Sequence, residues 1–340
     1  MKNNTLGALP KVELHCHLDG SLRPESCLEI GLEMGLIPSE STFQDVKSLL
    51  QAPRDCDSLE MYLKAFDLPI SLMQSKAVIK RFAFELFEDA ARESVRYLEV
   101  RFAPHLHTRK GLALSDVIES AIEGMRQAES LYPIKGNWIL SHLRHHSVQK
   151  MFDLIEAGLP YLNTGVVAVD LAGAEPLGYA HAFVEPVTYA REKGFQITMH
   201  AGETGHWENV ENAVRLLGAT RIGHGCAIAK HPETADLVKS HDVVIEACPT
   251  SNLQTKIVDV PQNHPINQFY LADMCVMVNT DNRTVSSTTM TLEYELLQSA
   301  FGWKHDAFKT MYINGIKGAF CDSAIKDWLY SFIPAFDNVD

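Results

Sequence analysis

Short apolar runs alternate along most of the chain with longer stretches whose apolar residues have helical spacing. Eight of the runs have the length and composition of strands, and each is followed by a helical pattern. Strands that alternate with helices form a parallel sheet, and eight such units favour a closed (β/α)8 TIM barrel of the α/β class over an open sheet. The predicted strands span residues 11–20, 95–104, 137–144, 166–173, 195–202, 220–225, 242–249 and 275–282.

Additional helices are expected after the first strand and at the C-terminus. After the first strand, Pro24 and Glu25 begin one helical pattern, and residues 76–93 form a strongly amphipathic one. No Pro- or Ser-rich linker divides the chain, so we predict one domain over residues 1–340 with a helical insertion at about 24–93. The other predicted helices span residues 114–131, 147–157, 178–193, 207–217, 231–240, 264–273, 287–301, 305–319 and 322–331.

Aromatic and methionine residues recur at helical spacing over residues 58–74. Such a stripe usually packs into a core. It also precedes the barrel proper, so Tyr62 and Phe66 are candidates for the wall of an apolar pocket. The spacing leaves both interpretations open.

Composition excludes several classes of protein. The net charge of −13 argues against broad binding to nucleic acid or to an anionic membrane. The seven cysteines are scattered without a CxxC pair, as in reducing compartments. The N-terminus lacks the apolar run of a signal peptide, and no stretch approaches the roughly 20 apolar residues of a membrane span. We expect a cytoplasmic protein with a small-molecule substrate; the sequence assigns no oligomeric state.

Ionisable residues stand where several predicted strands end. His15 and His17 end the first strand two residues apart, so both point to one side, about 6–7 Å apart. His200, His224 and Asp281 end the fifth, sixth and eighth strands. A lone HxH in a chain with 15 histidines occurs by chance. Five such residues at the catalytic end of a barrel, each emerging from an apolar run, instead predict a mononuclear metal site.

Three neutral imidazoles and one carboxylate suit Zn²⁺ and leave a position for water. We assign His15, His17, His200 and Asp281 as ligands of one Zn²⁺ per chain. His224 would then orient the water and balance its charge. Alternatively, His224 is a fifth ligand or a strand-end histidine whose ring is simply hydrogen-bonded. Glu203 follows His200 across an Ala-Gly turn and is the predicted proton donor.

Other motifs carry weaker signals. Asp170 and Glu175 flank Gly173, which permits close backbone approach to a ligand, although a simple strand end with a glycine turn fits equally well. His142, His145 and His146 lack a nearby carboxylate, so we expect them to support the site or lie on the surface. The chain has neither the P-C-x-x-C motif that is typical of one class of zinc enzymes acting on nucleobases nor a G-x-G-x-x-G or Walker loop.

With these residues identified, the chain resembles the adenosine deaminase family of the metal-dependent amidohydrolase superfamily. The shared motifs run in order from PKVELHCHLDGSL through LAGAE, MHAGE, RIGHG and ACPTSN to NTDN. The resemblance implies the zinc ligands assigned above, with Glu203 protonating purine N1. It also implies that His224 and Asp281 activate the water that attacks C6, so that ammonia leaves.

The same resemblance implies the substrate contacts. Gly173 would meet purine N3 through its N–H, and Asp19 would hold the ribose 5′-hydroxyl; His17 and Asn282 would border the base. Two positions depart from the family pattern. Asn282 replaces the second acid of TDDP and can donate to N7 without protonation. Ala174 replaces the acid of LAGDE.

The expected reaction is hydrolytic deamination of adenosine and 2′-deoxyadenosine in purine salvage. Adenine or a modified adenine nucleoside is the alternative substrate, although adenine-specific relatives tend to have Glu where Asp19 stands. An ester or amide hydrolase would not need Glu203 beside His200. A catalytically silent binding barrel is the remote alternative, and such a protein would be expected to lose a ligand or the acid.

Overall fold

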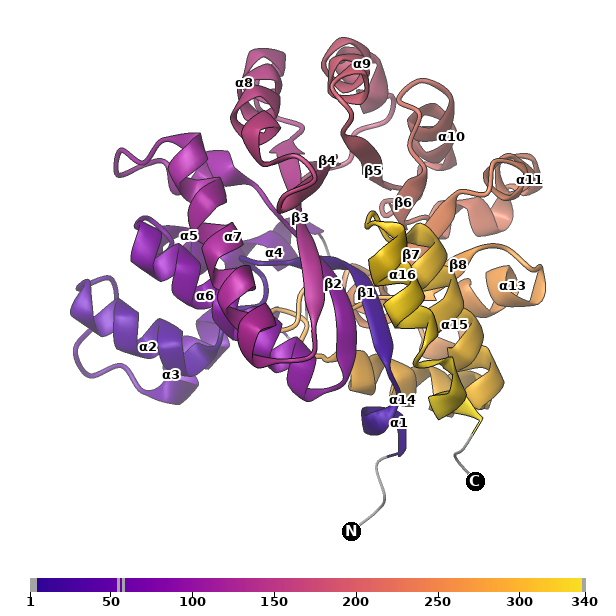
Figure 1. The fold of residues 1–340 in the computed structure, drawn as a ribbon, viewed down its shortest axis with the longest axis horizontal. Coiled ribbons are helices and arrows are strands. Elements are labelled where there is room, and N and C mark those ends of the chain that lie inside the picture. The colour runs from indigo at the N-terminus through magenta and orange to yellow at the C-terminus, as the bar shows by residue number, and fades with distance from the viewer. Residues whose placement is uncertain (1–4, 54–55, 57–58, 338–340) are drawn as a thin grey trace.

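The computed structural model describes residues 5–53, 56 and 59–337. Its eight parallel strands pair in sequence order, each with the next, and confirm the predicted barrel architecture (Figure 1). The strands are β1 (Lys11–His17), β2 (Val95–Phe102), β3 (Lys135–Leu143), β4 (Val166–Ala172), β5 (Gln196–Ala201), β6 (Arg221–His224), β7 (Val244–Ala247) and β8 (Val276–Val278).

Helices surround the barrel and follow the strands in the chain (Figure 1). Those that follow β2 to β7 include α7 (Leu114–Leu131), α8 (Val148–Gly158), α9 (Val184–Glu192), α10 (Trp207–Arg215), α11 (Pro232–Ser240), α12 (Pro249–Gln254) and α13 (Ile266–Leu271). After β8 come α14 (Met290–Phe301), α15 (His305–Gly318) and α16 (Ser323–Tyr330), while α1 (Thr5–Ala8) precedes β1.

Between β1 and β2 the chain forms a run of helices. These are α2 (Pro24–Glu33), α3 (Phe43–Leu50), α4 (Leu59–Leu63), α5 (Asp67–Leu72) and α6 (Lys76–Arg92). Our sequence analysis missed α3, whose start is marked by a capping box: the Thr42 hydroxyl accepts from the Asp45 N–H, and the Asp45 carboxylate accepts from the Thr42 N–H.

The last strands are shorter than predicted. We expected strands over residues 242–249 and 275–282, but β7 covers Val244–Ala247 and β8 covers Val276–Val278. Asp242 has a left-handed φ of 52°, which is incompatible with a strand, and Pro249 begins α12. The Asn279 N–H still donates to the Ala247 carbonyl of β7 (2.8 Å), and beyond it the chain turns towards β1.

This turn closes the barrel at the functional end. The Asp281 N–H donates to the His15 carbonyl (3.0 Å), and the His17 N–H donates to the Asp281 carbonyl (2.7 Å). The Asn279 side-chain oxygen accepts the N–H groups of Leu14 and His15. The segment after β8 and the strand β1 are therefore held together by main-chain and side-chain hydrogen bonds.

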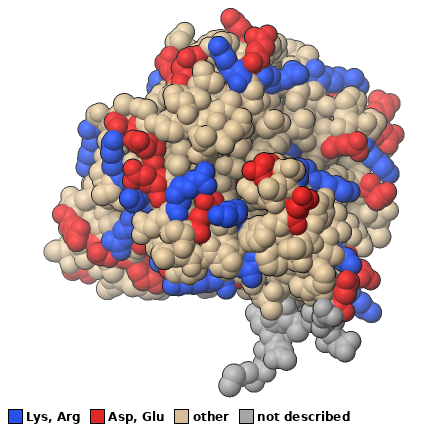
Figure 2. Space-filling model, in the orientation of Figure 1, with Lys and Arg blue, Asp and Glu red and all other residues tan. Residues whose placement is uncertain are grey.

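The surface carries both charges in a mixed arrangement. On the face in Figure 2, Lys and Arg side chains lie among Asp and Glu side chains, without a continuous basic area. Among the described residues, no helix has both the length and the apolar composition that a bilayer crossing requires.

Candidate active site

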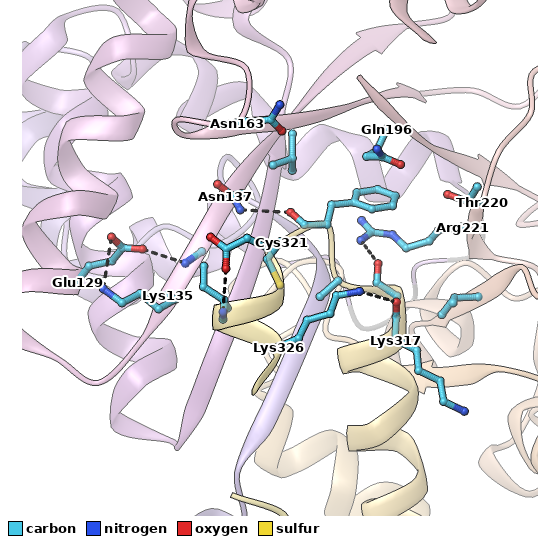
Figure 3. Close-up of a pocket in the computed structure, with 18 of the residues that line it drawn as sticks. Glu129, Lys135, Asn137, Asn163, Gln196, Thr220, Arg221, Lys317, Cys321 and Lys326 are labelled. Carbon is cyan, nitrogen blue, oxygen red and sulfur yellow. Dashed lines mark hydrogen bonds and ion pairs between the residues drawn. The ribbon is translucent and has the colours of Figure 1, made fainter. Parts of the chain in front are cut away.

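Two cavities lie at opposite ends of the barrel. The one at the amino ends of the strands has a volume of about 720 Å³, and its polar groups contact one another: Arg221 donates to the Gly318 carbonyl and Asn137 to the Phe320 carbonyl (Figure 3). The cavity at the carboxyl ends has a volume of about 330 Å³. All of the predicted site residues except His15 line this second cavity, and His15 is fully buried next to it.

Four of the predicted residues form a compact group of possible metal ligands. One donor atom from each of His15, His17, His200 and Asp281 lies within 4.8 Å of the other three. Asp281 Oδ1 is 3.3 Å from Nε2 of both His15 and His17, and the Nε2 atoms of His17 and His200 are 3.1 Å apart. Imidazoles and a carboxylate converging in this way suit a divalent transition metal.

The backbone is strained at two of the site residues. His224 and Asp281 have φ values of 68° and 61°, in the left-handed region that non-glycine residues rarely occupy. His224 ends β6 and Asp281 follows β8, so each conformation turns a side chain from the end of the barrel wall into the site. Strain of this kind persists where the surrounding structure holds it and is common at functional sites.

Buried carboxylates orient two of the histidines from behind. Glu246 Oε2 is 2.9 Å from Nδ1 of His15, and Asp170 Oδ2 is 2.9 Å from Nδ1 of His200. Arg101, also fully buried, donates to Glu246 (2.6 Å). A carboxylate on one ring nitrogen fixes the tautomer and leaves Nε2 free to bind a metal.

Our sequence analysis missed Glu246 and Arg101. Glu246 stands within the apolar run VVIEACP and Arg101 within EVRF. A charged residue inside a buried strand needs a partner, and this could have identified both residues from the sequence.

The charges of these groups fit metal binding. Burial lowers the pKa of His15 to about 4, so its ring is neutral near pH 7. Burial opposes the ionisation of Asp170, but His200 and Arg101 outweigh it and hold the Asp170 pKa well below its ordinary value. For Asp281 the nearby histidines likewise outweigh burial and lower the pKa. The site therefore presents a neutral imidazole at His15 and ionised carboxylates at Asp170 and Asp281.

A second possible ligand group combines His15, His224 and Cys248. Burial raises the pKa of the Cys248 thiol well above its ordinary value, so the thiol stays protonated. Because metals bind the thiolate, this group is the weaker candidate.

Glu203 lies in the cavity wall on a loop that another carboxylate holds. The Glu175 carboxylate accepts the N–H groups of Gly202 (2.7 Å) and Glu203 (2.9 Å), and the Asn209 side chain donates to it (3.0 Å). Glu203 Oε2 is 3.7 Å from His224 Nε2. Burial raises the pKa of Glu203, which keeps its carboxyl protonated to a higher pH than that of an exposed glutamate.

The remaining polar groups of the cavity suit a ligand with hydroxyl and amine functions. Asp19 Oδ1 is buried without a hydrogen-bond partner, and burial raises the pKa of Asp19 to about 7. Gly173 has a φ of 86°, which favours glycine. A Cβ on Gly20 would lie 1.8 Å from Oδ1 of Asn282, so the glycine makes room for this side chain.

An aromatic pair forms part of the cavity wall. Tyr62 and Phe66 both line the cavity, with ring centroids 6.3 Å apart, and the Tyr62 hydroxyl hydrogen-bonds to Ser286 (2.7 Å). His145 is exposed, in agreement with the surface position that was one of our two expectations for it, and it also lines the cavity. The turn after β3 carries it over the rim, which the strand pattern does not indicate.

Comparison with known proteins identifies the family. The family model described as adenosine deaminase matches residues 10–335. The chain belongs to the adenosine deaminase family. It is 48% identical to an adenosine deaminase from Shewanella woodyi over 95% of this chain and 97% of that protein. It is 47% identical to one from Clostridium perfringens over 94% and 97%.

Several solved structures have the same fold. An adenine deaminase from Arthrobacter aurescens superposes with a TM-score of 0.90 at 22% identity, covering 98% of this chain and all of that one. A zinc-bound amidohydrolase from Burkholderia ambifaria gives 0.88 at 26% identity, covering 99% and 94%. The N6-mAMP deaminase MAPDA from Arabidopsis gives 0.87 at 28% identity, covering 98% and 99%.

Proposed function

We propose that this member of the adenosine deaminase family hydrolyses adenosine and 2′-deoxyadenosine to inosine and 2′-deoxyinosine, releasing ammonia. The observation that carries the proposal is that the His15, His17, His200 and Asp281 group and the buried acid Glu203 border one cavity of about 330 Å³. Family membership and the names of relatives that match nearly the whole chain support the same reaction.

The ligand group fits one zinc ion. His15 Nε2 is buried without a hydrogen-bond partner and faces the carboxylate of Asp281, as expected of a ligand atom. When bound, zinc lowers the pKa of a coordinated water towards neutrality and so supplies the nucleophile. The zinc-bound amidohydrolase of the same fold supports this choice of metal.

The protein groups divide the proton transfers between them. Glu203, protonated because it is buried, donates to ring N1 as water adds to C6 of the base. Asp281, whose second oxygen accepts from the Ser251 hydroxyl (2.6 Å), is ionised before the reaction, orients the water and accepts its proton. His224, whose Nε2 is 3.7 Å from Oε2 of Glu203, stabilises the developing charge. The proton taken from the water then passes to the amino group, so that the C6–N bond breaks and ammonia leaves.

The cavity favours a nucleoside over a free base or a nucleotide. The unpartnered Asp19 oxygen offers an acceptor to a sugar hydroxyl, which adenine does not have. Among the described residues, the cavity lining includes no Lys or Arg to neutralise a 5′-phosphate. Gly173 would meet N3 through its N–H, and Asn282 would donate to N7, in a wall completed by Tyr62 and Phe66.

The state of the cysteines supports a cytoplasmic setting. Six of the seven, namely Cys16, Cys27, Cys226, Cys248, Cys275 and Cys321, are thiols and not disulfides in the structure, as is usual in a reducing compartment. We also propose that the chain acts as a single catalytic domain.

The test compares adenosine, adenine and AMP by the near-ultraviolet change that accompanies conversion of an adenine ring to hypoxanthine. Rapid turnover of adenosine, abolished by a chelator and restored by zinc, is the expected result. Preferential turnover of adenine or AMP would overturn the assignment of Asp19. If none of the three is turned over, the next candidates are modified adenine nucleosides as substrates and then a binding function without catalysis.

A further inference from the structure

A chain of buried side chains runs from His224 away from the cavity. Asn252 Nδ2 lies 3.0 Å from His224 Nδ1, and Asn252 Oδ1 lies 3.1 Å from Nε2 of His264. The backbone N–H of Ile266 is 3.1 Å from His264 Nδ1. His224, Asn252 and His264 are 1%, 0% and 4% exposed, so water does not compete for these contacts.

The backbone donor at one end determines the direction of every hydrogen bond. An amide N–H can only donate, so His264 Nδ1 is an acceptor. His264 is neutral because burial lowers its pKa to about 3, and its single ring proton is therefore on Nε2. That proton is donated to Asn252 Oδ1, which places the amide NH₂ against His224.

The consequence for His224 is a defined tautomer. The Asn252 NH₂ donates to Nδ1, so a neutral His224 carries its proton on Nε2. Nε2 is the nitrogen that faces the cavity, 3.7 Å from Glu203 Oε2. With that nitrogen protonated, His224 can neither bind a metal through it nor accept a proton from water.

We propose that Asn252 and His264 are positioning residues that lock His224 as a hydrogen-bond donor towards the reacting water and the charge that develops on it. Proton acceptance is then left to Asp281, because the locked ring has no lone pair directed at the cavity. The effect on rate rests on the proposed deaminase function, whereas the tautomer itself does not. The tautomer is therefore the first thing to measure.

Two-bond ¹H–¹⁵N spectra of the ¹⁵N-histidine-labelled protein report which ring nitrogen carries the proton. The His224 signals are assigned by their disappearance in His224→Gln, and spectra are recorded both with zinc and after chelation. We expect a protonated Nε2 and an unprotonated Nδ1 in both states. A protonated Nδ1 would overturn the proposal, whether or not the protein deaminates adenosine.

Asn252→Asp tests the consequence for catalysis. A carboxylate accepts from both neighbours, so His224 should move its proton to Nδ1 and lose its donor towards the cavity. Removing one such donor costs on the order of 10²–10³ in kcat, with KM and zinc content nearly unchanged. If the spectrum of the variant shows the proton on Nδ1 of His224 and kcat is nevertheless equal to that of the wild type, the proposed role of the His224 tautomer in catalysis is wrong.

Two further variants separate positioning from general damage. His264→Gln keeps this donor towards Asn252 and should retain most activity. His264→Leu leaves only the weak Cys226 thiol donor (3.3 Å) on Asn252 Oδ1 and should lower kcat, though less than Asn252→Asp. Asn314→Asp is the matched control, since Asn314 is also a buried amide but donates to the Val276 carbonyl at the start of β8. It should lower stability without changing the His224 spectrum. Equal activity in the two His264 variants would argue against the relay.

Discussion

Two histidine clusters lie at the same end of this barrel, and only one has the features of a metal site. The site cluster comprises His15, His17 and His200, with ring centroids 4.6 to 5.5 Å apart. The second cluster, which we call the rim cluster, comprises His105, His142, His145 and His146. Its spacing is similar: the ring centroid of His146 lies 4.6 Å from that of His145, 5.9 Å from that of His142 and 6.2 Å from that of His105.

Carboxylates distinguish the two clusters. Glu246, Asp170 and Asp281 contact the rings of the site cluster. In the described part of the chain, no carboxylate forms an ion pair with a ring of the rim cluster. Both ring nitrogens of His142 are buried without a partner. Closely packed imidazoles are therefore insufficient: a metal site also needs acids that orient the rings and balance the charge of the metal.

Removal of the ligand carboxylate should have the largest effect. We expect Asp281→Ala to abolish deamination and to weaken zinc binding severely, because it removes both a ligand and the group that orients the water. Zinc content after dialysis, measured by elemental analysis, checks the loss of zinc binding. A zinc content equal to that of the wild type would mean that Asp281 is not a ligand.

Glu203→Gln should separate catalysis from metal binding. The amide cannot protonate N1, so kcat should fall on the order of 10²–10⁴-fold while one zinc per chain remains. In the wild type, burial raises the Glu203 pKa, and the rate should decline as pH rises through that value because the donor loses its proton. This alkaline decline should be absent from the residual activity of the variant. Near-full activity would exclude Glu203 as the donor.

Asp170→Asn should make the site cluster more like the rim cluster. It leaves all four ligands in place but weakens the hydrogen bond that orients His200 and makes it basic. Loss of such a partner costs about 10–100-fold in metal affinity, with activity recovered at high zinc. Asp153→Asn, at an exposed helical position, is the control and should leave the zinc Kd unchanged. A Kd for Asp170→Asn equal to that of the control would contradict the importance of the carboxylate.

His142→Phe should have the smallest effect and should leave zinc binding intact. Burial lowers the pKa of His142 to about 4, so between about pH 6.5 and pH 4 the unfolded chain binds a proton that the native protein does not. Stability contributed by the neutral ring is therefore lost as pH falls through this window. The variant places a phenyl ring beside Phe183. Its free energy of unfolding should fall less steeply as the pH is lowered, and the difference in slope should correspond to at most one bound proton. Thermal unfolding measured across that pH range tests this, and an unchanged slope would contradict it.

The repeating pattern predicted the barrel because strands buried on both faces read as apolar runs with clear ends. The ends of these runs also pointed to His15, His17, His200 and Asp281 as site residues. The order of the motifs that contain them then indicated the family. Glu246 and Arg101 escaped prediction because their partners lie on other strands, brought together only when the barrel closes. The direction of the Asn252 relay depends on the contact between Ile266 N–H and His264, which no spacing rule indicates.

The central claim is that one zinc ion, held by the site cluster and Asp281, makes this chain an adenosine deaminase. The most direct test is a titration of chelator-treated protein with zinc while adenosine deamination is followed. Activity should rise from zero and reach a plateau at one zinc per chain. Activity that survives complete chelation, or that needs a second equivalent before it begins, would contradict the account.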